Sequence, residues 1–520
     1  MDDNTPMRLA RLAAILLIPA LASAAQQTLT PAPSDPAIAS ALQQVSPDRI
    51  RADIAKLVTF NNRSTLSSLD TDLPAGTGAL AASEWIFAEF THISAACNNC
   101  LDVRRDDFVE PPQKAVPGGS APRILKPTRI VNIYAVLRGS DPAQASRRVL
   151  VTGHYDSRNS DNFNTHDAAP GANDDASGVA VSLECARVLT ASKIKFPATI
   201  VFVAVAGEEQ GLNGSAHLAR LAKSEGWQLE AVLNNDIVGG DTTPGAAAGN
   251  PDTQQDKTSV RVFSEGVPGP ATLKQLHQIQ SAGSESDSPS RELARAVLDV
   301  STTYLGPTDQ HAPPAAPGRA RSHLVRLVPA FHPILIFRRD RFLRGGDHTS
   351  FNLEGFPAVR FTEWRENFDH QHQNVRTAPG TLPDGTTAPI QYGDLLQYVD
   401  TDYVANVARL NAATLAVLAL APAPPQNVHV ATANVDNNTK LTWDAPAGFP
   451  ANASYEIVSR DTTAATWTNS RPVAHNATSI TLPISKDNVV FAIRSVDPAG
   501  HRSPAIYPTG TLAATFPQPK

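Results

Sequence analysis

The chain has 520 residues, of which 42% are hydrophobic and 18% are charged, a composition normal for a globular protein. This length exceeds one ordinary hydrophobic core, so two or three domains are expected. The net charge of −6 gives no overall basic field, which argues against nucleic acid as a partner.

Residues 1–24 have the features of a secretory signal peptide. Arg8 and Arg11 precede an apolar run, residues 12–21, that is too short to span a bilayer, and Ala22-Ser23-Ala24 offers small residues for cleavage. The alternative, a short membrane anchor, is disfavoured by the length of the run. No later segment has 18 uninterrupted apolar residues. We therefore predict a secreted or periplasmic protein without a membrane span.

The next part of the chain, residues 25–45, is rich in Ala, Pro, Ser and Gln, which predicts a flexible lead-in. From residue 46 to 420, strand and helix patterns alternate, which predicts an α/β layered domain. The predicted helices are Pro47–Phe60, Leu80–Ile93, Ser177–Ser192, Ser215–Glu225 and Tyr403–Leu420, and the predicted strands are Arg129–Leu137, Arg148–Gly153, Ala198–Ala206 and Ala231–Ile237.

Cys97 and Cys100 form a C-x-x-C pair. A zinc site would need two more ligands nearby, and a thioredoxin-type redox role would need that fold. In an exported protein we predict a local disulfide instead. Cys185 falls within a helical pattern, Val179–Leu189, and is predicted to be a buried core residue.

Within the α/β domain, residues 239–346 contain many Gly, Pro, Ser and Asp residues, which predicts an insertion that forms a lid or pocket wall. It holds one short strand candidate, Val260–Ser264, and one helix candidate, Ser290–Tyr304. Arg344 and Trp364 are candidate wall residues, although both could equally lie on the surface.

A Pro-rich linker, residues 421–426, separates this domain from the C-terminal part. Short alternating segments in residues 427–520 predict a small β-sandwich with Trp443 and Tyr455 in its core. The segment resembles a fibronectin type III module, notably in residues 441–443 and 455–457. It is either a spacer or stabilising domain, or a module that binds a surface, a polymer or a protein.

Polar motifs follow the predicted strands of the α/β domain, and the pair Glu208 and Glu209 is the most informative. It comes directly after Ala198–Ala206, at an edge of the sheet where ligands bind in α/β proteins. Neighbouring side chains on an extended backbone point in different directions, so one carboxylate can hold a metal while the other faces a bound water. Taken alone, the pair would more often be a solvated turn.

Three further motifs lie at such strand ends. His154 can bind a metal through one ring nitrogen, and Asp156 can accept a hydrogen bond from the other. Residues 173–178 form a turn into a helix, where Asp174 could bridge two cations, and Asp236 belongs to the last motif. Asn and Asp often cap helices and turns. Four such motifs at successive junctions of one domain nevertheless indicate a metal site.

These motifs resemble those of the secreted two-zinc aminopeptidases, whose relatives include glutamate carboxypeptidases and the transferrin-receptor ectodomain. The family pattern is H-x-D, N-D-D-x-S-G, E-E-x-G-L-x-G-S and N-x-D, and the chain carries all four in order. The resemblance covers about residues 50–420. It implies a three-layer zinc-exopeptidase domain with a mostly parallel mixed sheet and two zinc ions.

The resemblance also implies roles for single residues. Asp174 would bridge both zinc ions, His154 and Asp236 would complete one site, and Glu209 would serve the other. Glu208 would be the general base. Asp156 would be a further catalytic residue beside His154, and the Asp174–Asp175 peptide bond would be cis.

The fifth zinc ligand has two candidates, because the family motif Y-H-T-x-x-D-T is only partly present in residues 368–375. His370 is favoured, since Asn374 stands four residues on, where the family has Asp. His372 is the alternative. Residues 346–351 match the family element S-D-H-x-x-F, which lies beside the pocket, so Asp347 and His348 are predicted to contact the substrate.

We therefore predict a zinc-dependent aminopeptidase that acts on peptides. A carboxypeptidase or dipeptidase would use the same metals with a different pocket. Glutaminyl cyclases share the fold but use one zinc and lack the first His ligand, so His154 argues against that activity. A receptor-like protein without metals is disfavoured, since at least four of the five ligand types are present.

Overall fold

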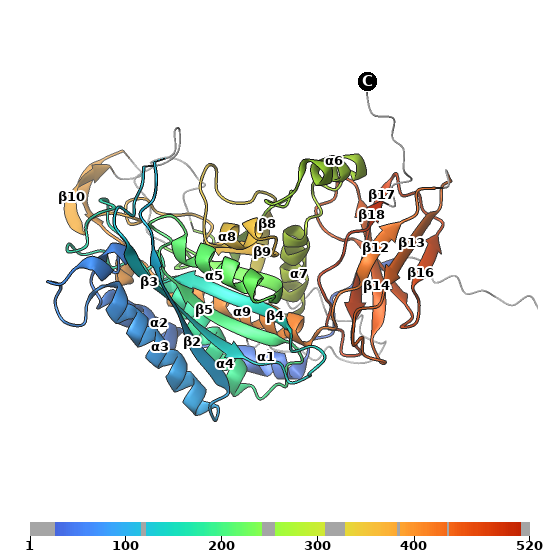
Figure 1. The fold of residues 1–520 in the computed structure, drawn as a ribbon, viewed down its shortest axis with the longest axis horizontal. Coiled ribbons are helices and arrows are strands. Elements are labelled where there is room, and N and C mark those ends of the chain that lie inside the picture. Colours follow the sequence, from blue (N-terminus) through green and yellow to red (C-terminus); the bar gives the residue numbers. More distant parts are fainter. Residues whose placement is uncertain are drawn as a thin grey trace, which may run out of the picture.

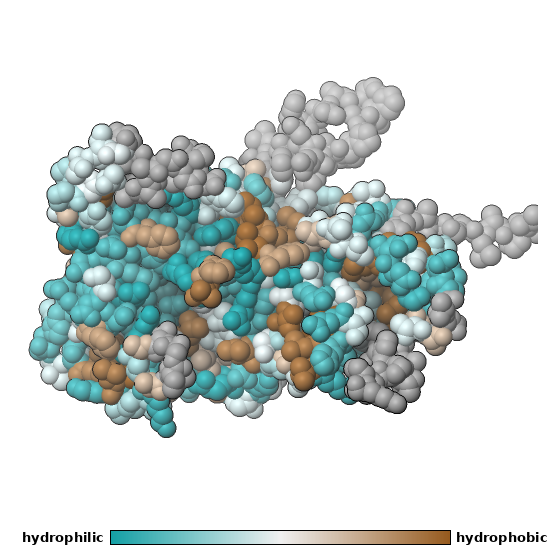
Figure 2. Space-filling view, turned by 90° about the horizontal axis from the view of Figure 1, so that it is seen from above, coloured by the Kyte–Doolittle hydropathy of each residue, from teal (hydrophilic) through white to brown (hydrophobic). Residues whose placement is uncertain are grey.

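The computed structural model describes residues 27–115, 121–241, 255–306, 328–381, 385–433 and 436–510. The predicted signal peptide lies outside these residues. The described chain forms a large body built on one sheet and a smaller all-β body beside it (Figure 1). Seen from above, the large body is mostly hydrophilic, and its exposed hydrophobic side chains gather in separate patches (Figure 2).

An eight-stranded mixed sheet lies at the centre of the large body, in the order β2-β3-β5-β4-β6-β9-β7-β8. β4 is parallel to both of its neighbours, β5 and β6, and β6 is parallel to β9. The predicted α/β class with a mostly parallel mixed sheet is therefore confirmed. The strands are β2 Leu101–Glu110, β3 Thr128–Leu137, β4 Arg147–His154, β5 Thr199–Val205, β6 Gln228–Asn235, β7 Ser259–Ser264, β8 His332–Ile336 and β9 Ala358–Thr362.

Helices cover both faces of this sheet and give the large body three layers (Figure 1). Successive residues of a strand point to opposite faces, so Ile200 and Phe202 join the core under α2, α3, α4, α7 and α9, while Val201 and Val203 face α5 and α8. The helices are α1 Pro36–Leu42, α2 Pro47–Val58, α3 Gly78–Ala96, α4 Ala176–Ala191, α5 Asn213–Ser224, α6 Leu273–Ala282, α7 Pro289–Tyr304, α8 His348–Leu353 and α9 Thr401–Leu420.

Among the helices of the described chain, only α9 is long and apolar enough to cross a membrane. Within the structure, however, 94% of that apolar stretch is buried. It packs against α4 and α7, and Val404 and Leu415 lie in the main core. The apolar surface of α9 is therefore buried in the core of the large body.

Two regions differ from the sequence-based expectation. The lead-in, residues 25–45, contains α1, which Asp35 caps by accepting the N–H of Ala37 at 2.7 Å and which buries Ile38 and Leu42. The expected insertion, residues 239–346, contributes β7 and β8 to the main sheet. β7 matches the predicted strand Val260–Ser264, whereas β8 is short and follows a Gly- and Pro-rich stretch, which hides its periodicity.

The smaller body is a β-sandwich of two four-stranded sheets, in the orders β1-β15-β14-β17 and β16-β13-β12-β18. Trp443 and Tyr455 lie in its core, as predicted. Its strand β1, Gln27–Thr28, comes from the start of the described chain and pairs with β15. The other strands are β12 Gln426–Val430, β13 Thr439–Asp444, β14 Ser454–Asp461, β15 Asn469–Val473, β16 Ser479–Leu482, β17 Val489–Val496 and β18 Thr509–Gly510, and a separate hairpin in the large body is β10 Arg376–Thr381 and β11 Thr387–Tyr392.

The cysteines behave as predicted. Cys97 and Cys100 form a disulfide just after α3, and Cys185 is free and buried in α4.

Candidate metal centre

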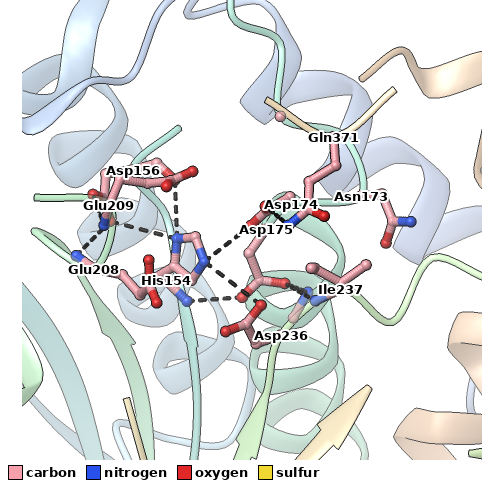
Figure 3. A network of polar contacts seen from close by, with 12 residues as sticks. His154, Asp156, Asn173, Asp174, Asp175, Glu208, Glu209, Asp236, Ile237 and Gln371 are labelled. Atoms are coloured by element: carbon pink, nitrogen blue, oxygen red, sulfur yellow. Dashed lines mark hydrogen bonds and ion pairs between the residues drawn. The ribbon is translucent and has the colours of Figure 1, made fainter. Parts of the chain in front are cut away.

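His154 is the last residue of β4, and its buried ring faces the carboxylates of Asp174 and Asp236 (Figure 3). Nδ1 lies 3.0 Å from the main-chain oxygen of Asp156, so Nδ1 carries the proton and Nε2 keeps its lone pair. Nε2 lies 3.2 Å from Asp174 Oδ1 and 3.9 Å from Asp236 Oδ1, and it has no hydrogen bond of good geometry to any described residue. A buried lone pair between two carboxylates fits a metal ion.

The turn before α4 fixes Asp174 at the middle of the centre. Asp394 accepts hydrogen bonds from the N–H groups of Asn173 and Asp174 at 2.8 and 2.7 Å. Asp175 caps α4 by accepting the N–H of Gly178 at 2.9 Å. The peptide bond between Asp174 and Asp175 is cis, as the family resemblance implies.

Gly178 is needed for the close approach of α4 to the sheet. A Cβ atom at this position would lie 2.3 Å from the main-chain oxygen of Asn235, which is closer than real Cβ contacts allow. The final glycine of the N-D-D-x-S-G motif therefore brings the helix, and with it Asp174, up to the end of β6.

The second oxygen of Asp174 faces a second group of ligand atoms. His372 Nε2 lies 2.9 Å from Asp174 Oδ2 and 3.0 Å from Glu209 Oε1. Asp174 thus belongs to two groups, one with His154 and Asp236 and one with Glu209 and His372, and the ligand atoms of each group lie within 4.8 Å of one another. Each group offers one imidazole and two carboxylates, which are zinc ligand types.

His370, the favoured fifth ligand, belongs to neither group. Its Nδ1 pairs with Asp241, and its ring stacks on Tyr398 with the ring centroids 3.8 Å apart. His370 was predicted because Asn374 takes the place of the Asp of the family motif. In the structure, a turn with φ of 56° at His372 brings the imidazole of His372 into the metal centre. The geometry therefore replaces His370 with the alternative, His372.

Comparisons with known proteins show which family the chain belongs to. Residues 132–312 match the model of peptidase family M28. A probable zinc metalloprotease of Leptosphaeria maculans is 39% identical over 92% of this chain and 98% of its own, and one of Pyricularia oryzae is 41% identical over 91% and 84%. The chain belongs to peptidase family M28. It is therefore a zinc-dependent peptidase, and zinc is the ion that the ligand groups fit.

Among solved structures, the LapA aminopeptidase of Legionella pneumophila is similar to this M28 peptidase, with a TM-score of 0.45 and 18% identity over 74% of each chain. This similarity is too distant to bear on the chemistry of the site.

Asp156 supports the turn that carries Glu208 and Glu209. Its carboxylate accepts the N–H groups of Glu208 and Glu209 at 3.3 and 3.2 Å and the hydroxyl of Thr65 at 3.1 Å. Asp156 Oδ1 lies 3.5 Å from His154 Nδ1, farther than the Asp156 main-chain oxygen at 3.0 Å. The main-chain oxygen thus orients the imidazole, and the carboxylate holds the glutamate turn. The prediction that the Asp156 carboxylate orients His154 is therefore corrected.

A cavity of about 730 Å³ opens over both ligand groups of the M28 peptidase. Asp174, Glu209, Asp236 and His372 all reach its wall, and so does the half-buried Glu208, which is in neither ligand group. A water and a substrate can therefore reach the ligands and Glu208 from the same side. Of the two candidate wall residues, Arg344 lines the cavity and Trp364 does not.

Asp347 and His348, the predicted substrate contacts, are fully buried, and neither lines the cavity. His348 Nε2 lies 2.7 Å from the main-chain oxygen of Arg339, and burial lowers the pKa of His348 to about 4. Both residues stand at the start of α8, whose Phe351 packs in the core between the sheet and α5. The prediction that Asp347 and His348 contact the substrate is therefore corrected: both are buried residues outside the cavity wall.

The pKa values show a surplus of negative charge in the centre. Burial and the neighbouring carboxylates raise the pKa of Glu208 well above its usual value and that of Asp347 to about 7. At Asp174 the effect of burial is outweighed by His372 and His154, which hold its pKa well below the usual range. Added cations would relieve the repulsion among these carboxylates, so the residues present fit metal ions.

Two arginines that sequence reasoning missed balance part of this charge. Arg158 Nε lies 2.8 Å from Glu209 Oε2, and Arg360 Nη2 lies 2.8 Å from Asp236 Oδ1. Each guanidinium therefore contacts a carboxylate of one ligand group. Arg360 is fully buried in β9, and a charged residue inside this apolar strand is the one signal that could have revealed it.

Proposed function

We propose that this peptidase is an aminopeptidase that uses two zinc ions. The supporting observation is that Asp174 belongs to two ligand groups at once. His154 and Asp236 would hold one ion with it, and Glu209 and His372 the other. Three protein ligands for each ion leave room for water or substrate. When bound, zinc lowers the pKa of a water molecule and polarises a peptide carbonyl.

Glu208 is the general base in this proposal. It lines the cavity beside the ligand groups without belonging to either, and burial raises its pKa, which strengthens it as a proton acceptor. Glu208 would accept the proton of the attacking water and donate it to the leaving amine. Asp156 would keep the carboxylate in place through the turn.

The same surplus of carboxylates supports the choice of an aminopeptidase. The carboxylates of the metal centre form an acidic floor of the cavity. The protonated α-amine of a peptide would be attracted to this floor, whereas a C-terminal carboxylate would be repelled from it. Binding the free amine beside the metals would place the first peptide bond of the substrate at the reacting groups.

The test combines metal analysis with Glu208→Gln. We expect zinc near two ions per chain, release of N-terminal residues that a chelator abolishes, and a ~10²–10⁴-fold loss of kcat in Glu208→Gln with unchanged zinc content. Glu84→Gln, on the exposed surface of α3, is the matched control. One zinc per chain would contradict the two-ion proposal. Retained activity in Glu208→Gln would remove the base assignment.

We also infer that the protein is exported. The inference is supported by the signal-peptide pattern of residues 1–24 and by the disulfide Cys97–Cys100, since disulfides persist in oxidising compartments. Sequencing the N-terminus of the protein from the medium or periplasm should locate a cleavage after Ala24. An intact N-terminus on protein that stays with the cytoplasm would contradict export.

A further inference from the structure

Arginines make one part of the cavity wall cationic, although the floor is acidic. The wall arginines are Arg123, Arg158, Arg341 and Arg344. Arg158 is paired with Glu209, and Arg341 is paired with Asp340 and Glu366 at 3.0 and 2.8 Å. The charges of these two are largely used by the protein itself, which leaves Arg123 and Arg344 as candidate contacts for a ligand.

Arg123 has no carboxylate partner among the residues that the structure describes. Its main-chain N–H donates to Gln113 Oε1 at 2.7 Å, and its Nη1 donates to the main-chain oxygen of Glu209 at 2.5 Å. Gln113 in turn donates to the main-chain oxygen of Gln210 at 2.8 Å. The half-buried guanidinium is therefore fixed beside the Glu208–Glu209 turn with its charge uncompensated.

Arg344 shares its only carboxylate partner among the described residues. Its Nη1 lies 2.7 Å from Glu366, which also pairs with Arg341 at 2.8 Å and Arg261 at 3.2 Å. One carboxylate cannot neutralise three guanidinium groups. The side chain of Arg344 is 35% exposed, and its guanidinium lies 5.7 Å from the ring centre of Phe368, another residue of the cavity wall.

We propose that Arg123 and Arg344 bind a carboxylate of the peptide substrate. The proposal deepens the proposed aminopeptidase function and rests on it: the amine lies toward the acidic floor, and a carboxylate farther along the peptide reaches the arginine wall. Guanidinium groups bind carboxylates through charge-assisted hydrogen bonds. The carboxylate is either the C-terminus of a short peptide or an acidic side chain that follows the cleaved bond.

The experiment measures kcat/KM on matched peptides. Leu-Ala against Leu-Ala-amide tests the terminal carboxylate, and Leu-Glu-amide against Leu-Gln-amide tests the acidic side chain. We expect the wild type to favour the charged member of at least one pair by ~10–100-fold. Arg123→Gln should remove most of this preference and Arg344→Gln part of it, so that kcat/KM falls more for the charged peptides than for the neutral ones. Arg123→Lys should restore part of the preference.

Arg104→Gln, an exposed pair with Asp102 on β2, is the control and should keep the preference. No charge preference in the wild type, or an equal loss on charged and neutral peptides in Arg123→Gln, would overturn the proposal. N-acetylated versions of the same peptides separate it from the aminopeptidase assignment. Their cleavage with the same preference would contradict the aminopeptidase and support the carboxylate site.

Discussion

The metal centre and the junction between the two bodies both bury several carboxylates, but only the junction balances them with arginines. There, Asp287 before α7 pairs with Arg295 at 3.1 Å and with Arg460 of the sandwich at 2.5 Å. Arg494 of the sandwich pairs with Asp299 at 2.5 Å and with Glu456 at 2.7 Å. The pairs of Asp287 with Arg460 and of Asp299 with Arg494 link the two bodies.

In the metal centre the carboxylates exceed the cationic groups of the chain. The cationic partners are Arg158 and Arg360, joined by the imidazoles of His154 and His372. The carboxylates that they face are Asp156, Asp174, Asp175, Glu208, Glu209, Asp236 and Asp347. Buried carboxylates that are paired with arginines of the chain therefore indicate a structural role. Buried carboxylates that outnumber their cationic partners indicate a site for added cations.

The largest predicted effect comes from a substitution that removes a carboxylate from the junction. Asp287→Ala leaves Arg295 and Arg460 buried without this partner and should lower the free energy of unfolding by about 3–5 kcal/mol. Urea unfolding checks it. Asp107→Asn, in a surface pair with Arg129, is the control and should cost about 0–1 kcal/mol. Equal effects of the two changes would mean that the junction pairs contribute no more than surface pairs.

The next prediction tests the metal side of the comparison. His372→Ala should lower zinc content from two ions toward one and weaken the remaining activity by more than the ~10–100-fold typical of outer-shell changes, because it removes a ligand atom of the second group. His370→Ala should retain both ions. Zinc analysis after dialysis measures the difference, and the reverse pattern would restore His370 as the ligand.

The pairing of Glu366 with arginines predicts how the stability of the protein depends on pH. Burial alone would raise its pKa, but Arg341 and Arg344 outweigh burial and lower it to about 2 from a usual 4.5. A carboxyl with a lowered folded-state pKa stabilises the fold above pH 4.5 and loses this contribution, about 3 kcal/mol, as pH falls toward 2. Acid unfolding of metal-free protein should thus be less steep in Glu366→Gln. Identical acid limbs would contradict the assignment.

The smallest predicted effect concerns the support under the glutamate turn. Asp156→Asn replaces a carboxylate that accepts the N–H groups of Glu208 and Glu209, so the turn should loosen and kcat should fall by ~10-fold while the protein stays folded. Steady-state kinetics and zinc analysis check it. A loss as large as that of Glu208→Gln would show that Asp156 takes a direct part in the reaction.

The sequence predicts those metal ligands that lie at the ends of single strands and helices. His154, Asp174 and Asp236 each lie at or next to the end of one regular element, so the local sequence pattern predicts their positions. His372 could not be chosen over His370, because the choice depends on a turn whose Asn374 accepts hydrogen bonds from Ser160, which is remote in the sequence.

The same reason explains what the sequence missed in the fold. Arg158 and Arg360 act through partners that are distant along the chain, and β8 is recognisable only from its pairing with β7. The lead-in looked flexible by composition, yet its strand β1 pairs with β15, more than four hundred residues away.

That pairing affects how the protein responds to proteolysis. β1 belongs to the sandwich. α1, a few residues later, packs in the large body against α4 and α9 (Figure 1). The two bodies are thus tied by two separate crossings of the chain, one before α1 and one at the Pro-rich linker. A single cut within residues 421–425 should leave the fragments associated, and they should separate only under denaturing conditions.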